Sequence, residues 1–184
     1  MLPPDRSVYG EYKMIEYIYH DLLFAAGYLP YALVVGIPVA AVLMWMMNRR
    51  KGNVKPAALL PVAVFGIYFA VMFVITFLSR ESGSRKGVVD LEIFSTWGIN
   101  ARNNAFVVEN VLLFIPYGFF ACLAFKWKKR LLCCTLLGAC TSLGIECLQL
   151  VTRRGYFQID DILTNILGTL MGWGIFRLLF WKRR

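Results

Sequence analysis

The sequence has little of the chemistry that most metalloproteins and hydrolases use. Its 184 residues include a single histidine, His20, and five cysteines. All five cysteines lie inside apolar segments, with no CxxC pair and no histidine nearby, which argues against a metal centre or a disulfide framework. No serine, histidine or cysteine constellation indicates a nucleophilic mechanism. From these absences we expect neither a metal ion nor an organic cofactor.

Acidic residues and long polar segments are also scarce. Eleven acidic residues stand against 20 basic ones, which gives a formal net charge of +9. A basic balance can indicate nucleic-acid binding, but here the basic residues form short clusters between apolar runs, which fits membrane topology better. We therefore expect no nucleic-acid partner. The longest polar stretch covers only residues 79–104, so the sequence indicates no separate soluble domain.

Apolar residues dominate what is present. They make up 59% of the chain, above the share of about half that soluble domains have. A helix needs about 20 mostly apolar residues to cross a bilayer. We predict an all-α fold, a polytopic membrane helix bundle with about five transmembrane helices within residues 22–184. The predicted spans are 22–47, 57–78, 105–125, 131–151 and 162–181.

The two ends of the chain and its basic clusters predict an orientation. The segments NRRKGNVK, KWKKR and WKRR are dense in lysine and arginine and contain no carboxylate. The positive-inside rule places such segments in the cytoplasm. We therefore expect a multi-pass protein of the cell membrane, with the N-terminus outside and the C-terminus in the cytoplasm. The tyrosine-rich residues 1–21 would form an extracytoplasmic tail that lies in the membrane interface.

Polar residues recur at helical spacing near the outer ends of the last three spans. Glu146, Gln149 and Arg153 are three and four residues apart, which places them on one helix face. Asp161 and Asn165 share a face of the last span in the same way. We predict that these groups form one outward-facing polar pocket. Its candidate ligand-binding residues are Arg80, Glu109, Asn110, Glu146, Gln149, Arg153, Arg154, Asp160, Asp161 and Asn165.

How deep each polar group lies in the membrane decides whether we expect a functional or a structural role for it. A charged residue at the centre of a membrane helix costs about 2.5–3.5 kcal/mol. Arg153 and Asp161 lie close enough to the interface to be solvated, whereas Glu146 and Asn165 lie deeper. Glu146 should face the bundle, either paired with an arginine or protonated because of desolvation. The alternative is that the polar groups only join helices, at about 0.6 kcal/mol per hydrogen bond.

A GxxxG motif runs from Gly168 to Gly172 in the last predicted span. Small residues at this spacing let two membrane helices approach closely. Close helix packing is therefore the first interpretation. A dimer through Gly168 and Gly172 is a further expectation, and membrane lipids are the other partners that we expect.

Three motifs in the second half of the chain resemble the VanZ-like family of bacterial membrane proteins. They are NVLLFIPYGFF, SLGIECLQL and a block that reads RG-F-IDDI-TN-LG, with a weaker echo in TFLSR. The family is named for a protein linked to low-level teicoplanin resistance, which is a phenotype and not a reaction. Gln158 stands where members commonly carry an aspartate. The residues that the resemblance implies are Asn110, Phe114, Pro116, Gly118, Glu146, Gln149, Arg154, Asp160, Asp161, Asn165 and Gly168.

The functional hypothesis that we favour is binding. The outward pocket would bind an amphiphile, either a lipoglycopeptide such as teicoplanin or a lipid headgroup resembling a cell-wall precursor. Arg80 and Arg154 would pair with phosphate or carboxylate, for which the forked guanidinium is suited. Asp160, Asp161 and Glu146 would pair with an amine or hold the arginines. The segment IFSTWG could cover the site from above, or serve as an ordinary interfacial belt.

Two other classes of function remain open. The protein could be an enzyme acting on a lipid-linked substrate at the outer leaflet, with Glu146 as the candidate acid or base. Asp160 and Asp161 are then weak candidates for a magnesium site, because consecutive residues of a helix point about 100° apart. The protein could also be a subunit of a transporter or flippase, although five spans without duplicated halves argue against an autonomous transporter.

Overall fold

The computed structural model describes residues 6–52, 55–80, 83, 88–125, 127 and 130–180. Within these residues, five helices are long and apolar enough to cross a membrane. The predicted all-α bundle with five transmembrane helices is thereby confirmed. The elements are α1 (Arg6–Gly27), α2 (Leu29–Lys51), α3 (Pro56–Phe73), the π-helix η1 (Val74–Leu78), β1 (Val89–Asp90), α4 (Ala101–Ala124), α5 (Arg130–Thr152), β2 (Phe157–Gln158) and α6 (Ile159–Phe180).

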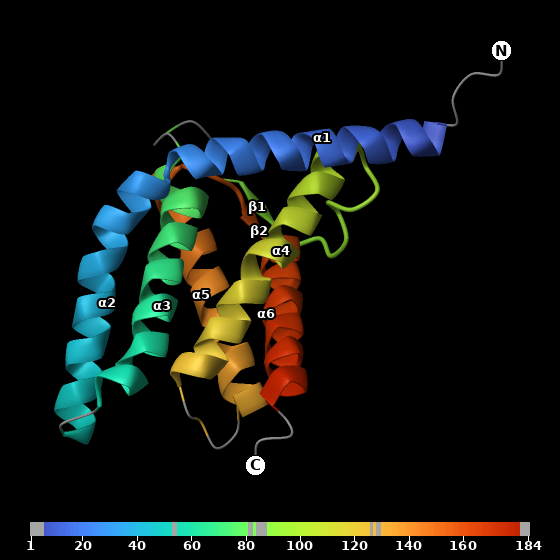
Figure 1. Ribbon diagram of the computed structural model, residues 1–184. Coiled ribbons are helices and arrows are strands. Elements are labelled where there is room, and N and C mark those ends of the chain that lie inside the picture. The colour runs from blue at the N-terminus through green and yellow to red at the C-terminus, as the bar shows by residue number, and fades with distance from the viewer. Residues whose placement is uncertain are drawn as a thin grey trace.

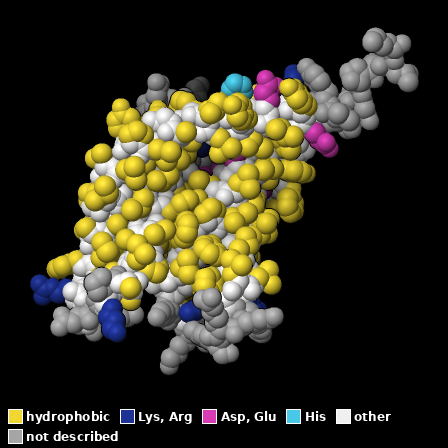
Figure 2. Space-filling view, viewed as in Figure 1, with side chains coloured by type: hydrophobic (Ala, Val, Ile, Leu, Met, Phe, Trp, Pro, Cys, Tyr) yellow, Lys and Arg dark blue, Asp and Glu magenta, His cyan; other side chains and the backbone are white. Residues whose placement is uncertain are grey.

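Helices α2 to α6 stand side by side, and α1 runs across one end of this bundle (Figure 1). The short parallel strands β1 and β2 pair at the same end, Val89 with Phe157 and Asp90 with Gln158. We call this the α1 end. The basic side chains visible in Figure 2 gather mainly at the opposite end, and the acidic ones near α1, with an apolar belt between them. Which end faces the cytoplasm stays a prediction.

The first spanning helix begins later than the sequence predicted. We expected a span over residues 22–47, but the structure has α1 end at Gly27 and a spanning helix over Leu29–Arg50. Pro30 lies in the first turn of α2, where its fixed φ suits a helix start. Leu22 and Phe24 therefore belong to the crossing helix α1, and both are 61% exposed. Composition alone does not reveal where an apolar run changes direction.

Glycines let α4 and α6 approach closely, and this pair has the most extensive contact in the bundle. A Cβ at Gly168 would collide with the carbonyl oxygen of Val111, and one at Gly172 with that of Ile115. Both glycines are buried, so the GxxxG motif serves packing within the chain. A dimer through Gly168 and Gly172 would have to displace α4 from these contacts.

Candidate functional site

Polar side chains from four elements meet near the α1 end. Arg80 follows η1, and its guanidinium lies close enough to Glu109, Glu146 and Asp161 to act on each carboxyl group electrostatically. The carboxyl groups come from α4, α5 and α6 respectively. Helical spacing explains why each helix turns its polar face inward, because the remaining faces are apolar. We call the following set the polar cluster: Arg80, Glu109, Asn110, Glu146, Gln149 and Asp161.

Glu146 is the most deeply placed carboxyl group of the cluster, with 2% of its surface exposed. Its Oε2 atom accepts a hydrogen bond from the backbone N–H of Gln158 at 3.0 Å. The chain reverses after α5 and returns through β2, which brings this N–H back toward the helix. Glu146 was predicted to pair with an arginine or to be protonated. A backbone amide is its direct hydrogen-bond partner, with Arg80 nearby, and both alternatives stay predictions.

Gln149 connects α5 to the end of the second span. Its side-chain amide donates to the carbonyl of Thr76 at 2.9 Å, and its Oε1 atom lies 3.5 Å from Nη1 of Arg80. Carbonyl groups in the last turn of a helix have no partner within that helix. Gln149 satisfies one of them and at the same time orients the Arg80 guanidinium, so it is a positioning residue of the cluster.

Arg154 satisfies the other carbonyl groups at the same helix end. Its Nη1 atom donates to the carbonyl of Arg80 at 2.6 Å and lies 3.3 Å from those of Phe77 and Leu78. The guanidinium also stacks 5.1 Å from the Phe77 ring centre. A cation at a helix C-terminus is favoured by the helix dipole. Arg154 therefore stabilises the backbone segment that carries the Arg80 side chain. Its Nη1 atom makes these contacts and is not offered to a ligand.

Asp160 and Asp161 are neighbours in sequence but face different surroundings. Both oxygens of the buried Asp160 carboxyl group accept backbone N–H groups, from Phe94 at 2.7 Å and from Thr96 at 2.9 Å. Asp161 instead lies within hydrogen-bonding reach of Asn110 on α4. This division argues against the weak magnesium site. No group of three His, Cys, Asp or Glu within the described residues could hold a metal ion.

Asn165 and Arg153 lie outside the polar cluster. Asn165 is buried one turn along α6, where its Nδ2 atom donates to Oγ of Ser142 at 2.8 Å. That bond joins α5 to α6, as the structural alternative predicted. Its Oδ1 atom has no hydrogen-bond partner within the described residues. Arg153 has left-handed backbone (φ 54°), and its side chain is exposed at the end of α5.

A contact that the sequence did not predict joins α1 to the cluster. Asp21 of α1 forms an ion pair with Arg102 of α4 at 2.8 Å. Asp21 also lies within hydrogen-bonding reach of Glu109. Arg102 stacks on the ring of Phe106 at 4.4 Å and of Tyr17 at 5.1 Å. In the sequence, Arg102 and Phe106 are four residues apart, which predicts a contact between them on one helix face. That spacing gives no information about a partner on α1.

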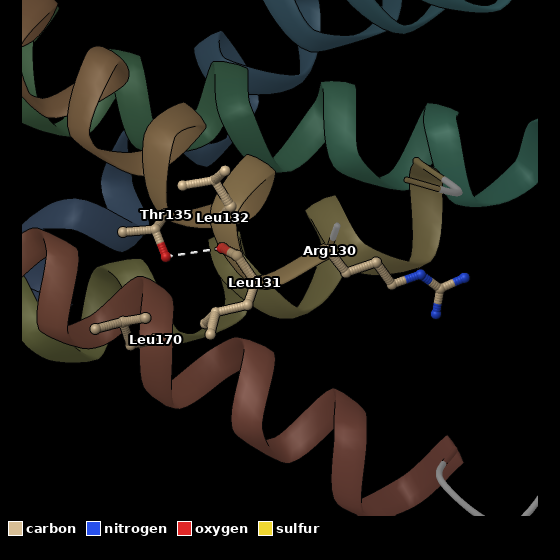
Figure 3. A pocket seen from close by; sticks show the side chains of 5 residues that line it. All are labelled: Arg130, Leu131, Leu132, Thr135 and Leu170. Atoms are coloured by element: carbon tan, nitrogen blue, oxygen red, sulfur yellow. Dashed lines mark hydrogen bonds between the residues drawn. The ribbon is translucent and has the colours of Figure 1, made fainter. Parts of the chain in front are cut away.

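Two cavities in the described part of the chain lie away from the polar cluster. One, of about 450 Å³, lies beside the start of α5 and is lined by Arg130, Leu131, Leu132, Thr135 and Leu170. Figure 3 shows that Arg130 points away from the other lining residues and that Thr135 bonds its own helix. A second, of about 260 Å³, lies near the end of α2 and beside Phe125. Neither is the outward cavity between the last three spans that the sequence predicted.

Comparison with known proteins gives one match. A family model described as VanZ/LLP1 matches residues 64–180. The matched region extends from within α3 to the end of α6, so it includes every member of the polar cluster. No curated protein and no solved structure matches the chain.

Proposed function

Because this chain belongs to the VanZ/LLP1 family, we propose that its polar cluster binds the headgroup of an amphiphile at the outer face of the cell membrane. The ligand would be a lipoglycopeptide such as teicoplanin, or a lipid that resembles a cell-wall precursor. Binding would contribute to glycopeptide resistance or alter the cell envelope. The protein itself is a VanZ-like membrane protein with five apolar helices of spanning length.

The observation that carries this proposal is the balance of charge around Arg80. One guanidinium faces the carboxyl groups of Glu109, Glu146 and Asp161. Among the described residues, none of these three carboxyl groups forms an ion pair with Arg80 at 4.0 Å or less, and a hydrogen-bond partner of the guanidinium there is the Gln149 amide oxygen at 3.5 Å. Unpaired charged groups at membrane depth are expensive and mark functional sites.

The same geometry suggests which headgroup would fit. An anionic phosphate or carboxylate would bind the forked guanidinium of Arg80. An ammonium group on the same headgroup would bind the carboxyl groups that face Arg80. One acceptor, Oε1 of Glu109, is buried without a partner within the described residues, and it would gain a donor. A headgroup that carries both charges therefore suits the cluster better than one that carries a single charge.

The structure also supports a smaller binding set than the sequence did. Arg154 and Gln149 contact the end of the second span and hold Arg80, and Asp160 holds the backbone at residues 94–96. These three residues would position the site without touching the ligand. Direct contacts would come from Arg80, Glu109, Glu146 and Asp161, with Asn110 beside Asp161.

Binding to the purified protein tests the proposal. In nanodiscs of uncharged lipid, we expect teicoplanin to bind the wild type, and a glycopeptide without an acyl chain to bind more weakly. Arg80→Gln and Glu146→Gln should each weaken binding by about tenfold or more, which corresponds to about 1.4 kcal/mol. Charge-matched controls are Arg49→Gln, at the opposite end, and Glu16→Gln, on the exposed side of α1. Equal affinity for all five proteins would overturn the proposal.

A growth assay gives an independent measurement. Expression of the wild type in a susceptible Gram-positive strain should raise the inhibitory concentration of teicoplanin, whereas the Arg80→Gln variant should not. Both proteins must be present in the membrane at equal amounts, as measured by immunoblotting. Equal protection by the two proteins would mean that the polar cluster is not what protects the cell.

A further inference from the structure

The segment between the second and third spans presents apolar side chains outward. Of its residues, Phe94 is 78% exposed and Trp97 is 54% exposed. Three aliphatic neighbours are between 57% and 64% exposed, namely Leu91, Ile93 and Ile99. We call residues 91–99 the apolar loop. A contiguous exposed apolar patch of this kind marks a surface that meets a protein or a membrane.

The apolar loop is held in place from within. Asp160 accepts hydrogen bonds from the backbone N–H groups of Phe94 and Thr96. In the middle of the loop the Ser95 hydroxyl donates to Asp90 at 2.9 Å, and near its end the N–H of Gly98 donates to the Asn104 side chain at 2.7 Å. The exposure of the apolar side chains is thus fixed by specific bonds and by the β1–β2 pair at its start.

The backbone at Phe94 has an unfavourable conformation, and this conformation accompanies the outward direction of the ring. The φ angle of Phe94 is 64°, in the left-handed region that disfavours residues with a side chain. Such a conformation is unfavourable for a residue with a side chain and persists only where surrounding contacts enforce it. The bond from the Phe94 N–H to Asp160 is such a contact. The result is a large aromatic ring directed away from the protein.

We propose that the apolar loop inserts into the membrane leaflet at the α1 end, with Phe94 and Trp97 as anchors at headgroup depth. The loop leads into α4 at Ala101, at the end of a spanning helix, so it lies where a leaflet begins. Further along α4, Leu112 is 49% exposed. Tryptophan is enriched at this interface because its ring is amphipathic, which suits Trp97, and Phe94 adds apolar surface beside it.

The occupant of the patch is lipid, and not a protein partner, because the loop leads directly into α4, which is long and apolar enough to cross a membrane. Asp160 acts as the positioning residue, since it fixes the loop without touching lipid itself. The insertion goes beyond the proposed function, because it needs no ligand in the polar cluster. A failure of headgroup binding would therefore leave this inference standing, and the reverse is also true.

Fluorescence quenching in liposomes tests the insertion. The contribution of Trp97 is the difference between the emission of the wild type and of Trp97→Phe, because the chain has five tryptophans. We expect lipids brominated on their acyl chains to quench this contribution, and aqueous iodide to leave it nearly unchanged. Quenching by iodide and not by brominated lipid would overturn the proposal. Quenching by neither would also overturn it, since the ring would then be covered by protein.

The role of Asp160 is tested by Asp160→Asn, which keeps the size of the side chain but replaces one acceptor with a donor. The freed loop should lose quenching by brominated lipid and gain quenching by iodide. Glu92→Gln is the control, because Glu92 lies in the loop, is exposed and bonds Asp90 through its backbone only. Unchanged lipid quenching in a helical Asp160→Asn protein would overturn the positioning role.

Discussion

Arg154 shows how a charged side chain at the edge of a membrane can be stabilised without a carboxylate. Three carbonyl groups at and just beyond the end of η1 lie close to its Nη1 atom, and the Phe77 ring centre lies 5.1 Å from the guanidinium carbon. Hydrogen bonds that involve a charged group contribute about 1.5–3 kcal/mol. We expect Arg154→Ala to lower the free energy of unfolding by about that amount, measured by thermal unfolding in detergent.

The neighbouring arginine provides the control. Arg153 is exposed, and substitutions at exposed positions usually change stability by less than about 0.5 kcal/mol. Arg153→Ala should therefore unfold near the wild-type temperature. Arg154→Lys should be intermediate, because an ammonium group keeps the charge but loses the planar stacking surface. If the two alanine variants lose equal stability, the capping role of Arg154 is wrong.

The residues of the polar cluster could be named from the sequence, but their partners could not. Spacing places Glu146 and Gln149 on one helix face, and membrane depth marks them as unusual. The hydrogen bond from Gln158 to Glu146 comes from a backbone amide, which the chain reversal after α5 brings into place. The identity of the side chain at position 158 does not predict this bond. The division between Asp160 and Asp161 likewise depends on which neighbour each helix face meets.

At the scale of elements, the ion pair that joins α1 to α4 is partly exposed. The Asp21–Arg102 ion pair is about one third exposed on each side, and such pairs contribute about 0–1 kcal/mol. Asp21→Asn should therefore leave global stability nearly unchanged. It should, however, increase hydrogen exchange within α1 while exchange in α4 and α6 stays as in the wild type. Equal exchange in the variant and the wild type would show that this ion pair does not hold α1.

The contact between α4 and α6 is less tolerant of change. A Cβ at Gly172 would collide with the Ile115 carbonyl and lie 2.7 Å from the Phe119 nitrogen. Overpacking of this kind costs about 1–3 kcal/mol, so Gly172→Ala should lower the unfolding temperature. Gly174→Ala is the matched control two residues along the same helix, where nothing lies within 4 Å. It should unfold at the wild-type temperature or above, because alanine favours helix.

The elements differ in how much of them the sequence revealed. Four spanning helices begin and end within a few residues of their predicted bounds, because a long apolar run between basic or polar turns leaves little choice. The break at Tyr28 and the π-helix at Val74–Leu78 were not predicted. Pro30 starts α2 after the break, but a proline within an apolar run can equally be a kink in one continuous span. The residues of the π-helix are as apolar as those of an unbroken span, so the sequence gives no local signal for it.

At the scale of the whole molecule, the charge pattern predicts one orientation. Glu16, on the exposed side of α1, should lie outside the cell, and Asn48, near the end of α2, inside. A membrane-impermeant maleimide should label Glu16→Cys in intact cells, and Asn48→Cys only after the membrane is opened. The wild type, whose cysteines lie within the spans, measures the background. Labelling in the reverse order would invert the predicted topology.

The π-helix at the end of the second span has a consequence for insertions and deletions. Its wider turn accommodates one residue more than an α-helix would, and Arg80 follows two positions after it. Removing a single residue from Val74–Leu78 would restore ordinary α-helical winding and keep the residues beyond it close to their present register. An added residue with no further wide turn to absorb it would instead rotate everything beyond it by about 100°, which would turn Arg80 away from the carboxyl groups. The second span should therefore tolerate the loss of one residue at this turn better than the gain of one.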